Sequence, residues 1–568
     1  MTPARRPGRR AATPVRLVTV LAVVALAATA CSGGGSGSKS SAESPTSTTV
    51  PNGGTLTIGA EQEPKCADWI DACSSQIWGS WILEAQTMPR AFDVVRNGDD
   101  WVYQPSNLLT GEPDVQTTPK QVVTYHINPQ ARWSDGQPIT SADFRYTWDQ
   151  VAHGENIYDQ TGYENIAAVD TPDPQTAVVT FAQPYAAWKG LFGGLYGVFP
   201  SHLLQGKDRD AAMKNGYTWS GGPWRMESWQ RGTSMTLVPN PQYWGTKPHL
   251  DRVVFLFLST TSSEFDAFKA GTVQALYPQP ELDVVDAIQQ GLPNANSKYT
   301  ADTGNLEALW FNNGSAPLDA LPVRQAVAYS LDRDEIVDRL FGMLGVHHPM
   351  QTLDAPTLAP YTDTSAFAGY RLDLSKVDSL MTGAGWAKGA DGVWAKAGKP
   401  ISLQLLTNAN NQRRSLTLQI VQEQLKSAGF PTTIRTVSSD DLGGVVASGD
   451  FQVALYAQVL TQLDPADCSI FCSDNIPTPA NGNSGQNWQR VNIPDLDPLL
   501  KTVETSLDES AREKAGKQAA KIEAANMIAL PLDPLPNILL WSKRIVGPVD
   551  DNPIYSMFVN MNEWGLRR

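Results

Sequence analysis

Residues 401–437 hold the pattern that most restricts the fold of this chain. Ile401–Leu406 is apolar enough for a buried strand, and Leu416–Ala428 carries apolar residues at helical spacing. Gly429 ends this helix, and Thr432–Val437 follows as a second strand. A strand, a helix and a second strand in this order imply parallel pairing through a right-handed crossover. The pattern therefore predicts an α/β fold.

Other parts of the chain show the same alternation of strands and helices. Thr55–Gly59 and Gln121–Ile127 alternate in the manner of strands. A helix is predicted to begin after Thr140 or Ser141, either of which can cap it, with Asp143 in the first turn where the helix dipole favours a negative charge. Further helices are predicted at Val323–Leu331, Glu335–Phe341 and Ala511–Met527.

Residues 1–30 have the features of an export signal. Five arginines and no acidic residue precede an apolar run, Leu17–Ala30, which is too short to span a bilayer. Ala28–Cys31 resembles a bacterial lipobox, although Ala28 stands where Leu is usual. We expect cleavage after Ala30 and acylation of Cys31, which would anchor the protein on the outer face of the cell membrane. Ordinary secretion with an unmodified Cys31 is the alternative.

The segment after the signal is predicted to be a tether, and the rest to be an acidic body. Residues 31–51 comprise the lipidated Cys and a stretch rich in Gly, Ser and Thr, which cannot bury a core. Without the five signal arginines, 39 Lys and Arg remain against 58 Asp and Glu, a formal charge of −19. Such a surface repels nucleic acid, so no nucleic-acid partner is expected.

The roughly 515 residues of the folded body are more than one hydrophobic core usually supports, so two or three domains are predicted. The 17 tryptophans favour an aromatic-lined binding surface.

Four further cysteines allow disulfides in a protein that leaves the cytosol. Three pairings are possible, and we favour the two local loops, Cys66 to Cys73 and Cys468 to Cys472. A metal site is the rival interpretation, but neither spacing is CxxC and no histidine is close in sequence.

Several motifs resemble those of the extracellular solute-binding protein family 5, the peptide, dipeptide and nickel group of ABC importers. Thr124–Phe144 (TYHINPQARWSDGQPITSADF) resembles the family signature. Gly221–Trp224 and Asn240–Gly245 (NPQYWG) are similar to its Gly-Pro-aromatic and NPxYWG elements. Three more stretches agree in order and spacing: Phe311–Asn313, Val323–Arg333 (VRQAVAYSLDR) and the glycine-rich loop Gly485–Asp497.

The resemblance implies a two-lobed periplasmic-binding-protein-like α/β fold (type II, cluster C), with an extra domain inserted in the first lobe. Such proteins close around a ligand by hinge motion, and the closed form delivers it to the permease subunits of an ABC transporter. The expected hinge lies near residues 305 and 535, and we expect a monomer. The expected divisions are 52–85, 220–305 and 536–568 for lobe I, 86–219 for the inserted domain and 306–535 for lobe II.

Candidate ligand contacts lie where loops of both lobes are expected to meet. Aromatic side chains supply apolar surfaces with a polar edge, and Ser, Asn and backbone groups can bond a peptide main chain. For each aromatic residue, ordinary core packing is the competing interpretation. Arg324 and Arg333 are expected to pair with nearby carboxylates instead of touching ligand. The candidates are Ser74, Ser75, Trp78, Trp219, Ser220, Gly221, Asn312, Tyr456, Gln458, Thr461, Asp464 and Trp488.

One position departs from the family pattern and bears on the ligand. In relatives that bind free peptides, an aspartate three positions before an acidic-Pro pair holds the ligand's α-ammonium. Here the pair is Asp464-Pro465, and the matching residue, Thr461, cannot neutralise an ammonium. Either Asp464, Asp467 or an acid of the other lobe takes over, or the ligand lacks a free amino terminus. Blocked peptides, peptide-like metabolites, glycans and siderophore-like compounds then become reasonable ligands.

Other classes of function find little support in the sequence. It lacks the G-x-S-x-G, H-E-x-x-H, phosphate-loop and G-x-G-x-x-G motifs, so an enzyme is not expected. His347, His348 and Met350 offer a minor option for nickel or haem, but adjacent histidines outside a helix usually point apart. We therefore expect no metal and no cofactor. A cell-envelope or regulatory lipoprotein of the same fold that has lost transport remains an alternative.

Overall fold

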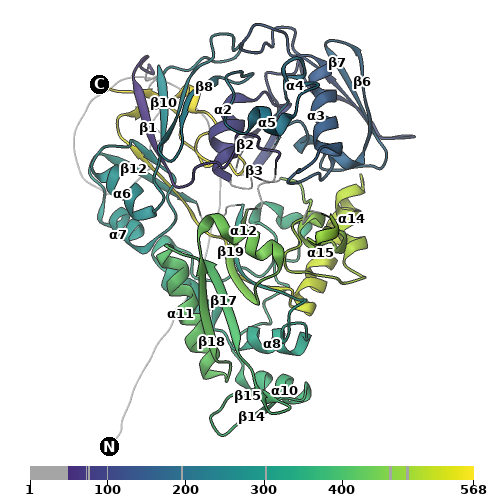
Figure 1. The fold of residues 1–568 in the computed structure, drawn as a ribbon, viewed down its shortest axis with the longest axis vertical. Helices are drawn as coiled ribbons and strands as arrows, with labels where there is room; N and C mark the ends of the chain where they lie inside the picture. The colour runs from purple at the N-terminus through teal and green to yellow at the C-terminus, as the bar shows by residue number, and fades with distance from the viewer. Residues whose placement is uncertain are drawn as a thin grey trace, which may run out of the picture. The chain divides into compact units, whose positions relative to one another are not determined.

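A seven-stranded mixed sheet contains strands from distant parts of the sequence (Figure 1). The computed structural model describes residues 49–71, 73, 77–98, 100–193, 196–300, 304–459, 463–481 and 485–568. The predicted strand at residues 55–59 is confirmed, and it pairs in parallel with two neighbours while the remaining pairs are antiparallel. In order across the sheet, the strands are β12 (Ala295–Thr300), β21 (Asn537–Ser542), β11 (Ala275–Leu276), β1 (Thr55–Ala60), β10 (Arg252–Phe257), β9 (Ser234–Pro239) and β8 (Trp224–Gln230).

A five-stranded sheet contains the predicted strand, helix and strand unit. β17 pairs in parallel with β18, and α11 (Gln412–Ser427) connects them and lies along both, as Figure 1 shows. This helix begins four residues earlier than predicted because the Asn411 side chain accepts a hydrogen bond from the Arg414 amide at 2.8 Å and caps it. The strand order is β18 (Thr432–Val437), β17 (Leu403–Asn408), β19 (Val453–Val459), β13 (Asn305–Phe311) and β20 (Ala529–Asp533).

A four-stranded antiparallel sheet is packed against α3 (Ser141–His153). The predicted helix start is confirmed by a capping box, in which the Asp143 carboxylate accepts a hydrogen bond from the Thr140 amide at 2.9 Å. The strand order is β4 (Asp114–Gln116), β5 (Val122–His126), β7 (Thr176–Phe181) and β6 (Ile166–Asp173).

The remaining elements are short or lie on the faces of these sheets. β2 (Phe92–Asn97) and β3 (Asp100–Pro105) form a hairpin, and β22 (Ile545–Val546) pairs with β23 (Gly565–Leu566). A small sheet contains β14 (Ala387–Lys388), β15 (Trp394–Lys396) and β16 (Lys399–Pro400). The other helices are α1 (Ile77–Gly79), α2 (Ala85–Thr87), α4 (Ser201–Leu204), α5 (Arg209–Met213), α6 (Thr261–Lys269), α7 (Leu282–Gln290), α8 (Leu321–Tyr329), α9 (Arg333–Phe341), α10 (Leu374–Gly383), α12 (Ser439–Ser448), α13 (Cys468–Phe471), α14 (Asp497–Thr505) and α15 (Glu509–Asn526).

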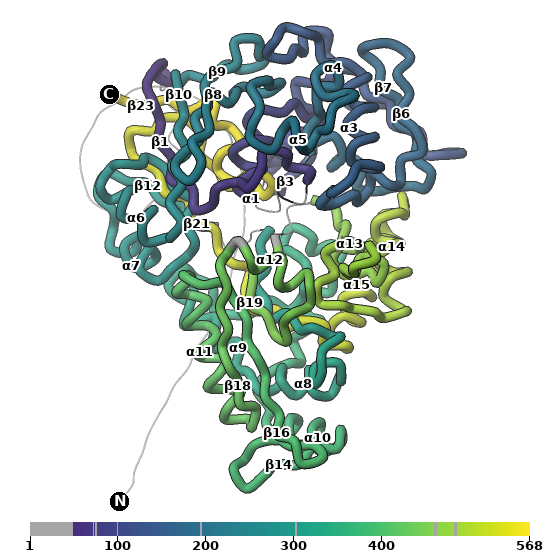
Figure 2. The backbone as a smooth tube through the Cα atoms, viewed as in Figure 1, coloured from purple at the N-terminus to yellow at the C-terminus, as the bar shows by residue number. Residues whose placement is uncertain are grey.

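The chain passes twice between the seven-stranded and five-stranded sheets. The first crossing leads from β12 to β13 and the second from β20 to β21. β12 and β21, the strands of the seven-stranded sheet at which the chain leaves and returns, pair with each other and are labelled in Figure 2. A hydrogen bond joins the two crossings. The side-chain nitrogen of Asn305, Nδ2, donates to Asn537 Oδ1 at 2.8 Å. These positions coincide with the segments expected to form a hinge. The hinge and the domain borders stay predictions.

The largest buried apolar cluster surrounds the five-stranded sheet and includes residues of α8 and α9. Each of these two helices also carries a buried arginine, and the partners of these arginines correct one expectation. Arg324 donates to the carbonyl oxygens of Met527 at 3.0 Å and Leu318 at 2.7 Å. Arg333 donates to carbonyl oxygens that include that of Pro531 at 2.9 Å. Both side chains are buried and satisfy unpaired backbone acceptors, so the expectation that they pair with nearby carboxylates is wrong.

Both predicted disulfides are present, Cys66 to Cys73 and Cys468 to Cys472. Within the described ranges, no helix combines the length and apolar character that a membrane crossing requires. The predicted export signal and Cys31 lie outside the described residues.

Candidate ligand-binding cavity

A cavity of about 1130 Å³ is lined by residues from the regions of all three large sheets. Small-molecule sites usually measure roughly 300–1,000 Å³, so this cavity has room for a solute of more than drug size. Its lining comes from loops, from helix α12 and from strand β19. Most lining residues lie within residues 61–81, 155–159, 277–280, 408–414, 439–447, 456–488 and 535–537, and the others are Tyr196, Asn305 and Leu358.

One side of the cavity is formed by aromatic rings that support each other. The rings of Trp78 and Trp81 meet edge to face with their centroids 5.3 Å apart, and Trp81 meets Tyr277 at 5.0 Å. The Trp81 indole also donates a hydrogen bond to the Ile554 carbonyl oxygen at 3.0 Å. Aromatic pairs of this kind contribute about 0.5–1.5 kcal/mol beyond their buried area. This surface is therefore held in position by the protein itself.

A second aromatic group follows the five-stranded sheet. Tyr456 on β19 stacks on Trp310 with ring centroids 5.3 Å apart, and Trp488 lies at 5.7 Å from Tyr456. The Tyr456 hydroxyl accepts a hydrogen bond from Gln489 Nε2 at 3.2 Å. The cavity thus has aromatic surfaces contributed by two different sheets.

Two hydrogen bonds connect distant segments across the cavity lining. The Tyr158 hydroxyl donates to Gln486 Oε1 at 3.4 Å, and Gln486 Nε2 donates to Asp159 Oδ2 at 3.3 Å. Gln486 lies in the glycine-rich loop, whereas Tyr158 and Asp159 follow α3. A ligand that reaches these side chains would have to replace these bonds with its own.

Arg414 lines the cavity and is held by hydrogen bonds to other side chains of the protein. Its Nε donates to Glu307 Oε1 at 2.7 Å and its Nη1 donates to Asn408 Oδ1 at 2.7 Å, while Arg413 binds the same Glu307 carboxylate. Burial opposes the charged form of Glu307, yet the two guanidinium groups outweigh it and lower its pKa to about 2. Glu307 therefore stays ionised at neutral pH.

Five of the twelve predicted ligand contacts line the cavity, and Asp464 has a partner in the protein. Arg512 Nη2 lies 3.2 Å from Asp464 Oδ1. Burial raises the pKa of Asp464, and the attraction of Arg512 opposes that shift. The contact of these five residues with a ligand stays a prediction. They are Trp78, Tyr456, Gln458, Asp464 and Trp488.

Four other candidates lie apart from the cavity lining and support the backbone. Asn312 donates to the carbonyl oxygens of Gly449 and Phe451 at 3.0 Å each. The Ser220 hydroxyl lies within hydrogen-bonding distance of the Thr87 and Trp224 carbonyl oxygens, at 2.8 and 2.5 Å. Trp219 stacks on Tyr217 at 4.2 Å, and a Cβ at Gly221 would lie 2.8 Å from Pro89. These four residues therefore have packing roles, and none of them lines the cavity.

The remaining three candidates, Ser74, Ser75 and Thr461, fall outside the described residues. The structure adds lining residues that the sequence did not indicate. Examples are Glu61, Tyr158 and Asn411, which stand in loops without periodic pattern. Glu61 follows the predicted strand Thr55–Gly59, and Asn411 lies between the predicted strand Ile401–Leu406 and the helix after it, where loops often form sites.

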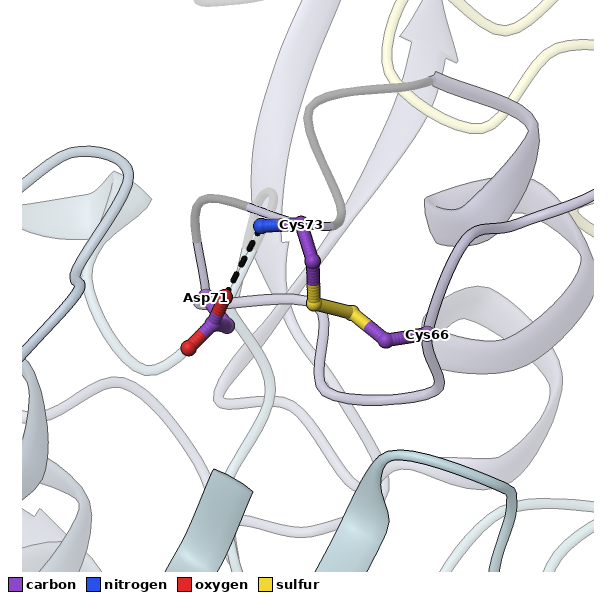
Figure 3. Close-up of side chains that lie close together, drawn as sticks. All are labelled: Cys66, Asp71 and Cys73. Carbon is purple, nitrogen blue, oxygen red and sulfur yellow. Dashed lines mark hydrogen bonds between the residues drawn. A yellow bond between two sulfur atoms is a disulfide. The ribbon is translucent and has the colours of Figure 1, made fainter. Parts of the chain in front are cut away.

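The groups that could hold a metal are occupied by other interactions. Cys66, Asp71 and Cys73 lie together, but the two sulfur atoms form a disulfide, and Asp71 accepts a hydrogen bond from the Cys73 amide at 2.8 Å (Figure 3). Asp68 and Asp71 also approach Asp210, where Arg209 Nε binds Asp68 at 2.6 Å and supplies the positive charge.

The two adjacent histidines face different carboxylates. His347 Nδ1 lies 2.7 Å from Asp338 and His348 Nδ1 lies 3.0 Å from Asp334. Neither histidine lines the cavity. We therefore do not propose a metal site at these two histidines.

Comparisons with known proteins agree with this arrangement. Residues 105–473 match the family described as bacterial extracellular solute-binding proteins, family 5 Middle. The oligopeptide-binding protein OppA of Mycobacterium tuberculosis is 26% identical over 505 residues, which cover 86% of this chain and 81% of OppA. Among solved structures, the periplasmic EDTA-binding protein EppA has a TM-score of 0.80 at 23% identity, covering 92% of this chain and 98% of EppA. The oligopeptide-binding protein AppA of Bacillus subtilis, in complex with a nonapeptide, has a TM-score of 0.79 at 19% identity, with coverages of 92% and 100%.

Proposed function

Because this chain belongs to the bacterial extracellular solute-binding proteins, family 5, we propose that it captures peptides or peptide-like solutes for an ABC importer. The observation that carries the proposal is the cavity of about 1130 Å³, whose lining comes from both the seven-stranded and the five-stranded sheet regions. The relative of similar length from Mycobacterium tuberculosis is described as an oligopeptide-binding protein, which favours peptides as the solute class.

Ligand capture is proposed to proceed by closure about the two chain crossings. A solute that touches both sides of the cavity stabilises the closed form, whereas a solute that touches one side leaves the equilibrium unchanged. Asn305 and Asn537 lie at the two crossings and are hydrogen-bonded to each other, so rotation there moves one sheet region against the other with few other changes. Permease subunits would then recognise the closed form.

The proposed place of action is the outer face of the cell membrane. The support is the sequence of residues 1–31, with an export signal followed by a cysteine for lipidation. Radiolabelled palmitate incorporation in the host, with Cys31→Ser as the control, tests the anchor. The variant should be exported but released, and equal labelling of both proteins would contradict the anchor.

Native mass spectrometry of protein purified gently from its own host tests the capture function. We expect a mass excess that disappears on denaturation and returns when a pool of short peptides is added. A matched variant, Trp488→Ala, should show a smaller excess, while Trp219→Ala outside the cavity should retain it in full. Absence of any bound solute before and after addition of peptides would contradict the proposal.

A further inference from the structure

A second cavity lies beside the start of β1 and the end of β23. It measures about 460 Å³ and shares no lining residue with the candidate ligand-binding cavity. Its lining contains three arginines and no acidic residue, although the chain without the signal arginines has a formal charge of −19. The lining residues are Pro51, Asn52, Gly53, Gly54, Thr55, Arg544, Leu566, Arg567 and Arg568.

The pairing of β22 with β23 brings two of these arginines together. Arg544 directly precedes β22 and Arg567 directly follows β23, and the Arg567 amide donates to the Arg544 carbonyl oxygen at 2.8 Å. The Arg544 side chain donates from Nε to the Arg567 carbonyl oxygen at 3.0 Å. This bond positions the guanidinium, whose two terminal nitrogens have no partner in the described part of the chain. Such nitrogens can donate to two oxygens of one phosphate group.

The positive charges of this cavity are not neutralised by the protein. Its three arginines and the neighbouring Lys543 are exposed, and no described carboxylate forms an ion pair with them. By contrast, Arg252 on β10 of the seven-stranded sheet is paired with Glu227 at 2.8 Å. Asp251 approaches the cavity, but it accepts a hydrogen bond from the Gly54 amide at 2.9 Å and is not part of the lining. The cavity is therefore a basic site on an acidic protein.

The segment that precedes β1 is packed closely against this site. A Cβ at Gly565 on β23 would lie 2.5 Å from the Pro51 carbonyl oxygen, so the two backbones are in contact. Gly53 and Gly54 then lead the chain into β1 with φ angles of +89° and +98°, which side chains other than glycine rarely adopt. The fold therefore fixes the three arginines beside the point where the predicted tether joins the folded body.

The predicted lipid anchor keeps this site within reach of the membrane. Thr49 follows Cys31 by 18 positions. An extended chain spans at most about 3.6 Å per residue, so these two residues are separated by at most about 65 Å. A site tethered in this way meets the surface at a high effective concentration. Because the body as a whole is acidic, the basic site marks the face that an anionic surface attracts.

We propose that this cavity binds the phosphate of an anionic phospholipid head group, and that this contact orients the folded body on the membrane. The three arginines donate hydrogen bonds to the phosphate oxygens, and Lys543 adds positive charge beside them. The inference goes beyond solute capture and rests only on the proposed place of action. A free phosphate ester offers the same chemistry, so the experiment includes both sources.

Cosedimentation with vesicles tests the lipid contact in the released Cys31→Ser protein, which lacks the predicted anchor. Vesicles of phosphatidylcholine alone are compared with vesicles of equal parts of phosphatidylcholine and phosphatidylglycerol. Each basic residue near an anionic surface strengthens binding about fivefold, so we expect partition into the anionic vesicles to be stronger by about tenfold or more. Raising the salt concentration should weaken this binding. Equal partition into both kinds of vesicle would overturn the proposal.

Glycerol phosphate, the free counterpart of the lipid head group, distinguishes the two sources. At a concentration equal to that of the accessible anionic lipid, it should leave vesicle binding unchanged, because a vesicle presents many head groups at once. Displacement of the protein from the vesicles at that concentration would overturn the lipid assignment in favour of a free phosphate ester. Calorimetric binding of glycerol phosphate by a protein that does not sediment with vesicles would overturn it as well.

Substitution of the arginines assigns the contact to this cavity. The double variant Arg567→Gln with Arg568→Gln should lower partition into anionic vesicles about 25-fold, and Arg544→Gln about fivefold. The matched control is Arg371→Gln, which removes an exposed arginine outside the cavity whose Nε also donates to a backbone carbonyl oxygen, that of Ala368 at 3.4 Å. The control should change partition less than twofold, and an effect equal to that of the double variant would overturn the site.

Peptide binding by the same proteins separates this inference from solute capture. The affinity for a pool of short peptides should be unchanged in the arginine variants, because none of these arginines lines the larger cavity. Peptide binding without vesicle binding would overturn the lipid contact and leave solute capture intact. Vesicle binding without peptide binding would support the lipid contact and contradict solute capture alone. Thermal unfolding of each variant shows that it is folded.

Discussion

The guanidinium of Arg512 binds the carboxylate of Asp464, with Nη2 and Oδ1 3.2 Å apart. The same guanidinium donates to the Val503 carbonyl oxygen at 2.8 Å, and its side chain is 5% exposed. Asp464 lies in the segment before α13, and Arg512 lies on α15. The pair therefore fixes one edge of the cavity to a long helix and gives Asp464 a structural role.

Asp464→Asn should lower the free energy of unfolding by about 2 kcal/mol, because it leaves a buried guanidinium with a weaker partner. The affinity of the variant for a pool of short peptides should change less than threefold. Urea unfolding and calorimetric titration measure the two effects, with Asp441→Asn as the exposed control. Unchanged stability together with a large loss of affinity would instead place Asp464 in contact with the ligand.

Glu307→Gln should be the most destabilising of these changes, by about 3–5 kcal/mol, since it leaves Arg413 and Arg414 without their shared carboxylate. The pKa of Glu307 falls from 4.5 to about 2 on folding, so its contribution is present above pH 4.5 and is lost as the pH falls toward 2.

The difference in unfolding free energy between the wild type and Glu307→Gln should therefore shrink over that pH range. Urea titrations at several pH values measure it. Glu227→Gln, which breaks an exposed ion pair with Arg252 at 2.8 Å, should cost less than about 1 kcal/mol. A pH-independent difference for Glu307→Gln would contradict the lowered pKa.

Reduction of the two disulfides should lower the thermal midpoint, with each bond contributing about 2 kcal/mol because the closed loops are short. Alkylation of the native protein before reduction should label no cysteine of either pair. Intact mass spectrometry after alkylation, with and without reductant, checks the pairing, and Cys66→Ser with Cys73→Ser isolates one bond. Labelling of Cys66 or Cys73 in the unreduced protein would show that their bond is absent.

Trp488→Ala should lower the affinity for a pool of short peptides about tenfold, which is a loss of about 1.4 kcal/mol of binding free energy. The reason is that Trp488 supplies part of an aromatic surface of the cavity. Trp219→Ala removes a ring that stacks on Tyr217 outside the cavity and should leave affinity unchanged. Equal losses in both variants would show that the effect comes from general destabilisation.

Local patterns in the sequence were sufficient to predict the main elements of the fold. The strand at residues 55–59, the capped helix after Thr140 and the parallel unit at 401–437 depend on neighbouring residues, so their signals are contained in short windows. The predicted partners of Arg324 and Arg333 were wrong, because backbone carbonyl oxygens that become acceptors only after folding leave no trace in sequence.

The cavity could be predicted only in part for the same reason. Tyr456 and Trp488 were predicted as single residues, whereas the hydrogen bond between Tyr158 and Gln486 joins side chains more than 300 positions apart in sequence. Asn312 and Ser220 were predicted as ligand contacts because loops of both lobes were expected to meet there, but they hydrogen-bond to backbone carbonyl groups. The same polar residue types stabilise turns and bind solutes, so the residue type alone does not distinguish the two roles.

The position of β21 imposes an order on the assembly of the newly made chain. This strand, Asn537–Ser542, lies between β12 and β11, so neither of those strands has its full set of backbone partners until the ribosome has synthesised the chain as far as Ser542. A nascent chain shorter than this exposes unpaired strand edges and cannot complete its largest sheet. Loss of the last 32 residues would remove β21 and separate β12 from the sheet, so a premature stop codon there would prevent folding of the sheet that contains β1.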